Sequence, residues 1–141
     1  MGVFLMTKEL KNHSYDARNY FDSQRFAFKG IITIIKNERN FRIQLVFSML
    51  VGLAGIFFGF SYQDWISVSL LIALVLISEA FNSSVEALAD TLSQEYRVNI
   101  KYAKDVSAGA VLISAGVSVV AGTLIVFPYV KEFVLELLEK L

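Results

Sequence analysis

Four polar residues follow an apolar stretch of the chain at the spacing of a helix. Glu79, Asn82, Glu86 and Asp90 come directly after Trp65–Ser78, a run that contains no charged residue. At about 100° and 1.5 Å per residue, the four side chains share a stripe about 80° wide and about 16 Å long. Ionisable residues inside a membrane span are costly and usually face a bundle interior or an aqueous cavity. The stripe therefore predicts a functional site, with Glu79 as a proton acceptor. For Asp90, the alternative is that it caps the helix and pairs with a Lys or Arg of the next loop.

Two further polar clusters flank the other apolar runs. Glu38, within Asn37–Asn40, precedes the first run, and Lys104 and Asp105 precede the third. Carboxylates from two helices, with amides nearby, suit Mg²⁺, which prefers oxygen ligands and often shares them with phosphates. A neighbouring Lys can neutralise charge on a phosphoryl group during its transfer. The alternative for Lys104 and Asp105 is a simple interfacial anchor.

The elements that would position these residues are three membrane-spanning helices. No charge occurs in Ile43–Gln63 or Val106–Val130, and a bilayer span needs about 20 apolar residues. We expect spans at 43–63, 65–87 and 106–130, within a single domain covering 1–141 and an all-α integral membrane fold. A soluble bundle is disfavoured because the third run has no polar face.

Lysine and arginine stay on the cytoplasmic side of membranes, and their distribution predicts the orientation. Eight of them lie in residues 1–42, and Arg97, Lys101 and Lys104 lie between the second and third spans. The first connection carries Asp64 and no basic residue. The N-terminus and the second connection are therefore expected in the cytoplasm of this multi-pass protein, so that all three polar clusters meet at that face.

The flanking segments have different predicted roles. Residues 1–19 resemble a flexible extension, and 20–40 mix Phe and Ile with spaced Arg and Lys, as in an amphipathic helix that lies in the membrane interface. A soluble linker is the alternative for 20–40. The tail, 131–141, is expected on the outer surface. Gly55 and Gly59 form a GxxxG pattern typical of close helix packing.

The stripe also resembles the signature of a known family. EAFNSSVEALAD, from Glu79 to Asp90, is similar to the signature of the small prokaryotic diacylglycerol kinases, with Phe81 where the family usually has an aliphatic residue. Asn37–Asn40 and Lys104–Leu112 also match, so that the resemblance covers about residues 25–127. It implies a homotrimer in the bacterial inner membrane that phosphorylates a lipid alcohol with ATP and Mg²⁺. The lipid would be undecaprenol or diacylglycerol, and no nucleic-acid partner is expected.

The same resemblance assigns roles to individual residues. Glu79 would be the base that deprotonates the lipid alcohol, with Asn82 positioning the reacting groups and Ala108 in the place of a substrate-facing residue. Glu38 and Glu86 would bind the metal. The expected ATP-binding residues are Phe26, Glu38, Glu86, Glu95, Tyr96, Lys104 and Asp105.

Two other functions compete with a kinase. The glutamates could line the pathway of a small oligomeric proton or ion conductor, or the chain could be a structural membrane subunit. A conduction pathway should cross the whole bilayer, yet Trp65–Ser78 offers only Ser67, Ser69 and Ser78 as polar side chains. Polarity confined to one half of the span favours the kinase.

Overall fold

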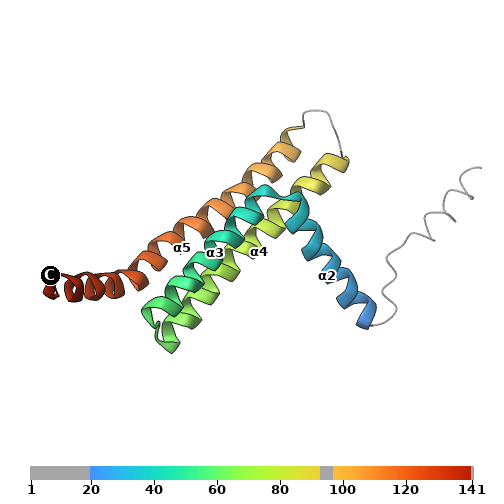
Figure 1. The fold of residues 1–141 in the computed structure, drawn as a ribbon. Coiled ribbons are helices and arrows are strands. Elements are labelled where there is room, and N and C mark those ends of the chain that lie inside the picture. Colours follow the sequence, from blue (N-terminus) through green and yellow to red (C-terminus); the bar gives the residue numbers. More distant parts are fainter. Residues whose placement is uncertain (1–19, 93–96, 141) are drawn as a thin grey trace, which may run out of the picture. The chain divides into compact units, whose positions relative to one another are not determined.

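The computed structural model describes residues 20–92 and 97–140, and these residues are helical almost throughout (Figure 1). Three of the helices are long and apolar enough to cross a membrane, as the charge-free runs predict. The chain divides after Thr33, and the residues on each side of that point are described separately. The helices are α2 (Tyr20–Asn37), α3 (Arg39–Phe58), α4 (Tyr62–Leu92) and α5 (Val98–Glu139).

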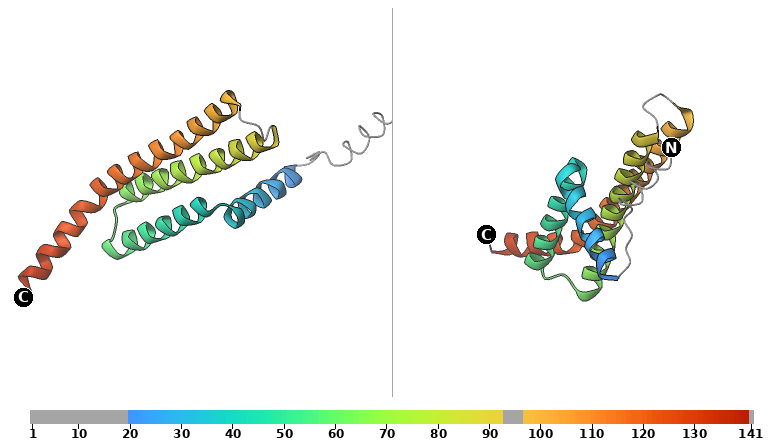
Figure 2. Two further views of the ribbon diagram at one scale, coloured as in Figure 1. Left: turned by 90° about the horizontal axis from the view of Figure 1, so that it is seen from above. Right: turned by 90° about the vertical axis from the view of Figure 1, so that its right-hand side faces the viewer.

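The two later helices are longer than the predicted spans. At 1.5 Å per residue, α4 is about 46 Å long and α5 about 63 Å, whereas the hydrocarbon core is about 30 Å thick. Both helices are therefore longer than one straight crossing of that core requires. The predicted tail, 131–141, has no boundary of its own at residue 131, because α5 continues to Glu139. Figure 2 shows α5 curving toward its C-terminal end, and Pro128, which cannot donate a helical hydrogen bond, accounts for the bend.

A tight turn joins α3 and α4. Helix α3 ends at Phe58, five residues before the predicted end of its span, because Gly59 adopts a left-handed conformation with φ 68°. Ser61 then caps α4, as its hydroxyl accepts a hydrogen bond from the Asp64 N–H at 3.2 Å. The hydroxyl also donates to the Asp64 carboxylate at 2.6 Å. The turn thus satisfies its own polar groups.

Aromatic side chains pack beneath this turn. The Phe60 ring lies 5.8 Å from that of Trp65 and 4.9 Å from that of Tyr129, measured between centroids. A Cβ atom at Gly55 would lie 2.8 Å from the Trp65 ring and 2.9 Å from the Phe60 ring. The two glycines of the GxxxG pattern therefore serve this turn: Gly55 makes room for the aromatic rings and Gly59 permits the reversal.

The three helices from Arg39 onward form a thin bundle. Helix α5 packs along α4, and α3 makes a smaller interface with α4 (Figure 2). Large apolar side chains on all three helices, such as Phe57, Leu70 and Leu124, remain exposed. Water would penalise so much apolar surface, whereas lipid chains solvate it. The exposure is thus that of a membrane protein.

A groove of about 680 Å³ lies between these helices. Its walls are almost entirely apolar. The groove extends from Gln44, near the start of α3, to Val130, near the far end of the bundle. Other lining residues are Phe47, Val51, Val68, Ile72, Ala115 and Val126.

Helix α2 has an apolar and a polar side. Phe21, Phe28, Ile31 and Ile32 are exposed, and the helix contains no residue that is buried. Such a helix is suited to a membrane interface. Its interfacial position stays a prediction.

Candidate functional site

The most buried carboxylate among the described residues is Glu79. Only 3% of its surface is exposed. It lies about 26 Å along α4 from Tyr62. The side-chain amide of Gln44 on α3 donates a hydrogen bond to its Oε2 at 3.0 Å. Glu79 is thus held from a second helix while the groove between α3, α4 and α5 begins beside it at Gln44.

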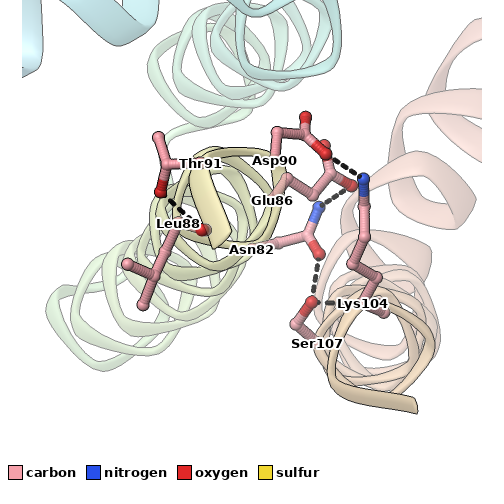
Figure 3. A network of polar contacts seen from close by, with 7 residues as sticks. All are labelled: Asn82, Glu86, Leu88, Asp90, Thr91, Lys104 and Ser107. Carbon is pink, nitrogen blue, oxygen red and sulfur yellow. Dashed lines mark hydrogen bonds and ion pairs between the residues drawn. The ribbon is translucent and has the colours of Figure 1, made fainter. Parts of the chain in front are cut away.

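Asn82, less than one turn further along α4, connects the site to α5. Its amide nitrogen donates to Glu86 Oε1 at 3.1 Å, and its Oδ1 accepts a hydrogen bond from Ser107 at 2.7 Å (Figure 3). Ser107 Oγ also lies 2.9 Å from the Lys104 carbonyl oxygen, so its single proton can serve either acceptor. Asn82 is 8% exposed. Both ends of this amide are therefore fixed, which orients Glu86.

Ion pairs occupy the outer part of the same stripe. The Lys104 ammonium lies 2.8 Å from Asp90 Oδ1, and Figure 3 shows it on the side where Glu86 also lies. Asp105 pairs with Lys101 at 2.5 Å, one turn away on its own helix. The interpretation of Asp90 as an ion-pair partner at the helix end is thus confirmed, while Asp105 is directed along α5 toward Lys101.

Glu38 lies at the break between α2 and α3. It is half-buried, and its extended backbone (φ −95°, ψ 115°) separates the two helices. Its side chain makes no capping hydrogen bond to α3. The Arg42 guanidinium instead donates to the carbonyl oxygens of Ile35 (3.2 Å) and Lys36 (2.7 Å), which lack helical partners at the end of α2. Arg42 therefore stabilises the helix break at which Glu38 lies.

The antiparallel packing brings Glu38 and Glu86 to the same level of the bundle. Gln44 and Glu79 mark one contact between α3 and α4. From that contact, Glu38 lies about 9 Å back along α3 and Glu86 about 10 Å forward along α4, both in the same direction. The predicted convergence of the polar clusters thus has a geometric basis in the helix register.

These residues fit a magnesium ion that is shared with a substrate. Among residues 20–92 and 97–140 there is no group of three or more His, Cys, Asp or Glu side chains that could enclose a metal. Mg²⁺ commonly takes only one or two protein carboxylates and completes its shell with water and phosphate. Asn82 uses one oxygen of Glu86, Oε1, and Glu38 is not engaged in capping. The donor set is suited to a metal that arrives with phosphates.

Four more residues were predicted for the site. Phe26 lies on α2, before the division of the chain at Thr33, with the Lys29 ammonium 5.7 Å from its ring centre. Ala108 is exposed on α5 next to Ser107. Glu95 and Tyr96 lie outside the described residues. The roles assigned to these four residues stay predictions.

Gln44 and Ser107 belong to the site but were not predicted from the sequence. Gln44 is the first polar side chain inside the charge-free run Ile43–Gln63, where an amide is costly unless it is hydrogen-bonded. That cost was the available signal. Ser107 gave a weaker signal in the sequence, because a serine in a membrane helix usually bonds to the backbone of its own helix.

Comparison with known proteins adds the family relationship. The sequence model described as "Prokaryotic diacylglycerol kinase" matches residues 25–126. Undecaprenol kinase of Bacillus subtilis is 30% identical over 118 residues, which cover 84% of this chain and 96% of the relative. A Synechocystis diacylglycerol kinase is 32% identical over 126 residues (86% and 70%). The Escherichia coli K12 diacylglycerol kinase is 32% identical over 107 residues (74% and 85%).

Proposed function

Because this chain belongs to the prokaryotic diacylglycerol kinase family, we propose that it is a lipid kinase that transfers the γ-phosphoryl group of ATP to a membrane lipid alcohol. The lipid is undecaprenol or diacylglycerol, the substrates that appear in the names of its relatives. The observation that carries the proposal is the buried Glu79, which lies in a helix long and apolar enough to cross a membrane and is hydrogen-bonded to a second helix.

In this proposal Glu79 accepts the proton of the lipid hydroxyl. A carboxylate buried within a span can meet a lipid alcohol that a water-soluble enzyme could not reach, and proton transfer to a positioned base is a common source of rate acceleration. Asn82 keeps Glu86 in a fixed orientation through its contact with Ser107. The apolar groove beside Glu79 supports the binding of a hydrocarbon chain, since its walls match lipid in polarity.

The nucleotide would bind about 10 Å closer to the membrane surface than Glu79. Glu38 and Glu86 would hold Mg²⁺, which supplies charge neutralisation at the β- and γ-phosphates. Lys104, with its ammonium at the same end of the bundle, adds positive charge for phosphate oxygens. The excess of Lys and Arg in residues 1–42 and 97–104 supports placing this end in the cytoplasm of the bacterial inner membrane, with the N-terminus on the same side.

We also propose that the chain functions as a homotrimer, as the family resemblance implies. The groove that opens between α3, α4 and α5 and the extensive exposed apolar surface are compatible with further helices packing on this bundle. Crosslinking of the purified protein in vesicles tests the assembly, and a purely monomeric species that is active would contradict it.

The proposed reaction is tested with purified protein in vesicles that contain either undecaprenol or diacylglycerol. Labelled γ-phosphate should move from ATP to one of these lipids when Mg²⁺ is present, and chelation of Mg²⁺ should stop the transfer. Comparing kcat/KM for the two lipids identifies the preferred substrate. Absence of lipid phosphorylation with both alcohols, in protein that is folded and assembled, would refute the proposal.

A further inference from the structure

The Gln44 side chain has a hydrogen-bonding capacity that the proposed reaction does not yet use. Its amide nitrogen donates to Glu79, but its carbonyl oxygen, Oε1, is buried and accepts no hydrogen bond from any described residue. Buried polar atoms almost always have a partner, and an exception calls for an explanation. A donor that arrives beside Glu79 during the reaction would be such a partner.

The hydroxyl groups that line the groove are already engaged. Ser48 donates to the Gln44 main-chain oxygen at 2.8 Å, and Thr123 to the Val119 carbonyl at 2.7 Å. Ser118 donates to the Leu71 carbonyl at 3.3 Å. The remaining walls of the groove are almost entirely apolar. Undecaprenol and diacylglycerol each carry one hydroxyl group, and its proton is directed to Glu79 if the proposed function holds. The reaction itself supplies a donor at this place, which is that same proton once it has moved to Glu79.

We propose that Gln44 is a positioning residue for the base, able to bind Glu79 in both of its states. In the carboxylate state, the amide N–H donates to Glu79, as the structure has it. In the acid state, the new O–H of Glu79 donates to Gln44 Oε1 while the N–H bond is retained. A primary amide and a carboxylic acid are complementary in this way, because each presents one donor and one acceptor at matching spacing.

The proposal places the proton in a balanced reaction. The lipid oxygen forms a bond to the γ-phosphorus as the bond from that phosphorus to the bridging oxygen of ATP breaks, and ADP leaves with the electron pair. The lipid O–H bond breaks, and its proton passes to Glu79. Gln44 then accepts the hydrogen bond from the protonated carboxyl, so the amide oxygen gains its partner as the proton arrives. The proposal rests on the proposed function, because it needs Glu79 to receive that proton.

Replacing Gln44 by Met tests this role in the intact protein. Methionine keeps nearly the same length and suits a membrane helix, but it removes both the donor and the strong acceptor. We expect kcat to fall about tenfold, the effect of losing one hydrogen bond that favours the transition state. The KM for ATP should change by less than about twofold, because Gln44 lies outside the proposed nucleotide site. Gln63→Met is the matched control, because it makes the same exchange at an exposed glutamine near the α3–α4 turn, outside the groove, and it should retain wild-type kcat.

A double-mutant cycle separates positioning of the base from a merely structural effect. With Glu79→Gln no acid forms, so that adding Gln44→Met should not lower the residual rate further. An equal tenfold loss in both backgrounds, or a wild-type rate for Gln44→Met, would overturn the inference. These results are distinct from failure of the proposed function, in which the wild-type protein itself transfers no phosphate to either lipid.

Infrared spectroscopy provides a readout that does not depend on turnover. In acidified samples, the difference between wild type and Glu79→Gln isolates the carbonyl stretch of the protonated Glu79 side chain. We expect a hydrogen-bonded band in the wild type and a band at higher frequency in Gln44→Met. A wild-type band at the frequency of an isolated carboxyl group, or one that Gln44→Met leaves in place, would contradict the pairing. The wild-type measurement alone decides the matter if Gln44→Met does not assemble.

Discussion

The two ends of the α3–α5 bundle use similar polar side chains in different ways. At the α3–α4 turn, Tyr129 donates to Asp64 at 2.5 Å and accepts a hydrogen bond from the Ser61 N–H at 3.1 Å. Every one of these groups is satisfied by the chain itself. At the other end, Gln44 keeps an acceptor without a partner among the described residues, and Glu38 does not cap its helix. The hydrogen bonds at the turn hold the helices together, whereas the polar groups at the other end can still bind substrates.

This difference predicts that mutations at the two ends affect different properties. Changes at the end with Glu79 should lower activity with little loss of stability. Changes at the turn should lower stability and leave the activity of the folded protein nearly intact. The predictions below follow this contrast, from the largest expected effect to the smallest.

Glu79→Gln should have the largest effect. The amide keeps the shape of the carboxylate but cannot accept the lipid proton, so that kcat should fall about 10²–10⁴-fold, as expected for loss of a general base. Lipid phosphorylation by the purified variant checks this, with thermal unfolding as the control for folding. Turnover at nearly the wild-type rate would remove Glu79 from the mechanism.

Glu38→Ala and Glu86→Ala should each lower the rate about 10²-fold, because charge neutralisation of the transferred phosphate is a large part of catalysis. Each should also raise the Mg²⁺ concentration needed for half-maximal activity. Since residues that share one cation act as a unit, the double variant should lose much less than the product of the two single losses. Independent, multiplying losses would show that the two glutamates do not bind the same ion.

Gly55→Ala tests the turn. Its new Cβ would lie 2.8 Å from the Trp65 ring, and such overpacking typically lowers the free energy of unfolding by about 1–3 kcal/mol. Gly52→Ala is the matched control on the same helix, because a Cβ there meets no atom within 4 Å. Unfolding in mixed detergent measures both variants. Equal stability for the two would contradict the packing described here, and so would a large fall in kcat for folded Gly55→Ala.

Tyr129→Phe should give the smallest effect. It removes the hydroxyl that joins Asp64 and Ser61 but keeps the ring against Phe60. We expect a small fall in the free energy of unfolding, because water can partly replace the lost hydrogen bonds at this exposed turn. The KM for ATP should stay unchanged, and a rise in it would mean that the two ends are coupled.

The sequence alone predicted the helices because their signal is simple. Long runs without charge fix the number of spans, and the positions of Lys and Arg give an expected orientation. Ends were harder to locate. Helix α3 stops at Gly59 through backbone conformation, and α5 continues past Val130 because helical hydrogen bonds do not require apolar residues.

The candidate site was predictable where its residues repeat along one helix. Glu79, Asn82 and Glu86 share a stripe that the helical period alone reveals. Gln44 and Ser107 could not be found in this way, because their contacts depend on the register between helices. The pairing of Lys104 with Asp90 rather than Asp105 depends on that register as well.

The contrast between the two ends is tested most directly by cysteine accessibility with and without MgATP. The chain contains no native Cys, so that Asn99→Cys near the start of α5 and Gln63→Cys near the turn can each be labelled alone. With a membrane-impermeant thiol reagent, Asn99→Cys should react only in inverted membranes, and MgATP should slow its reaction. Gln63→Cys should react only from the outside of intact cells, at a rate that MgATP does not change. Labelling of Asn99→Cys from outside, or protection of Gln63→Cys by MgATP, would contradict a cytoplasmic nucleotide site at the end that holds Glu79.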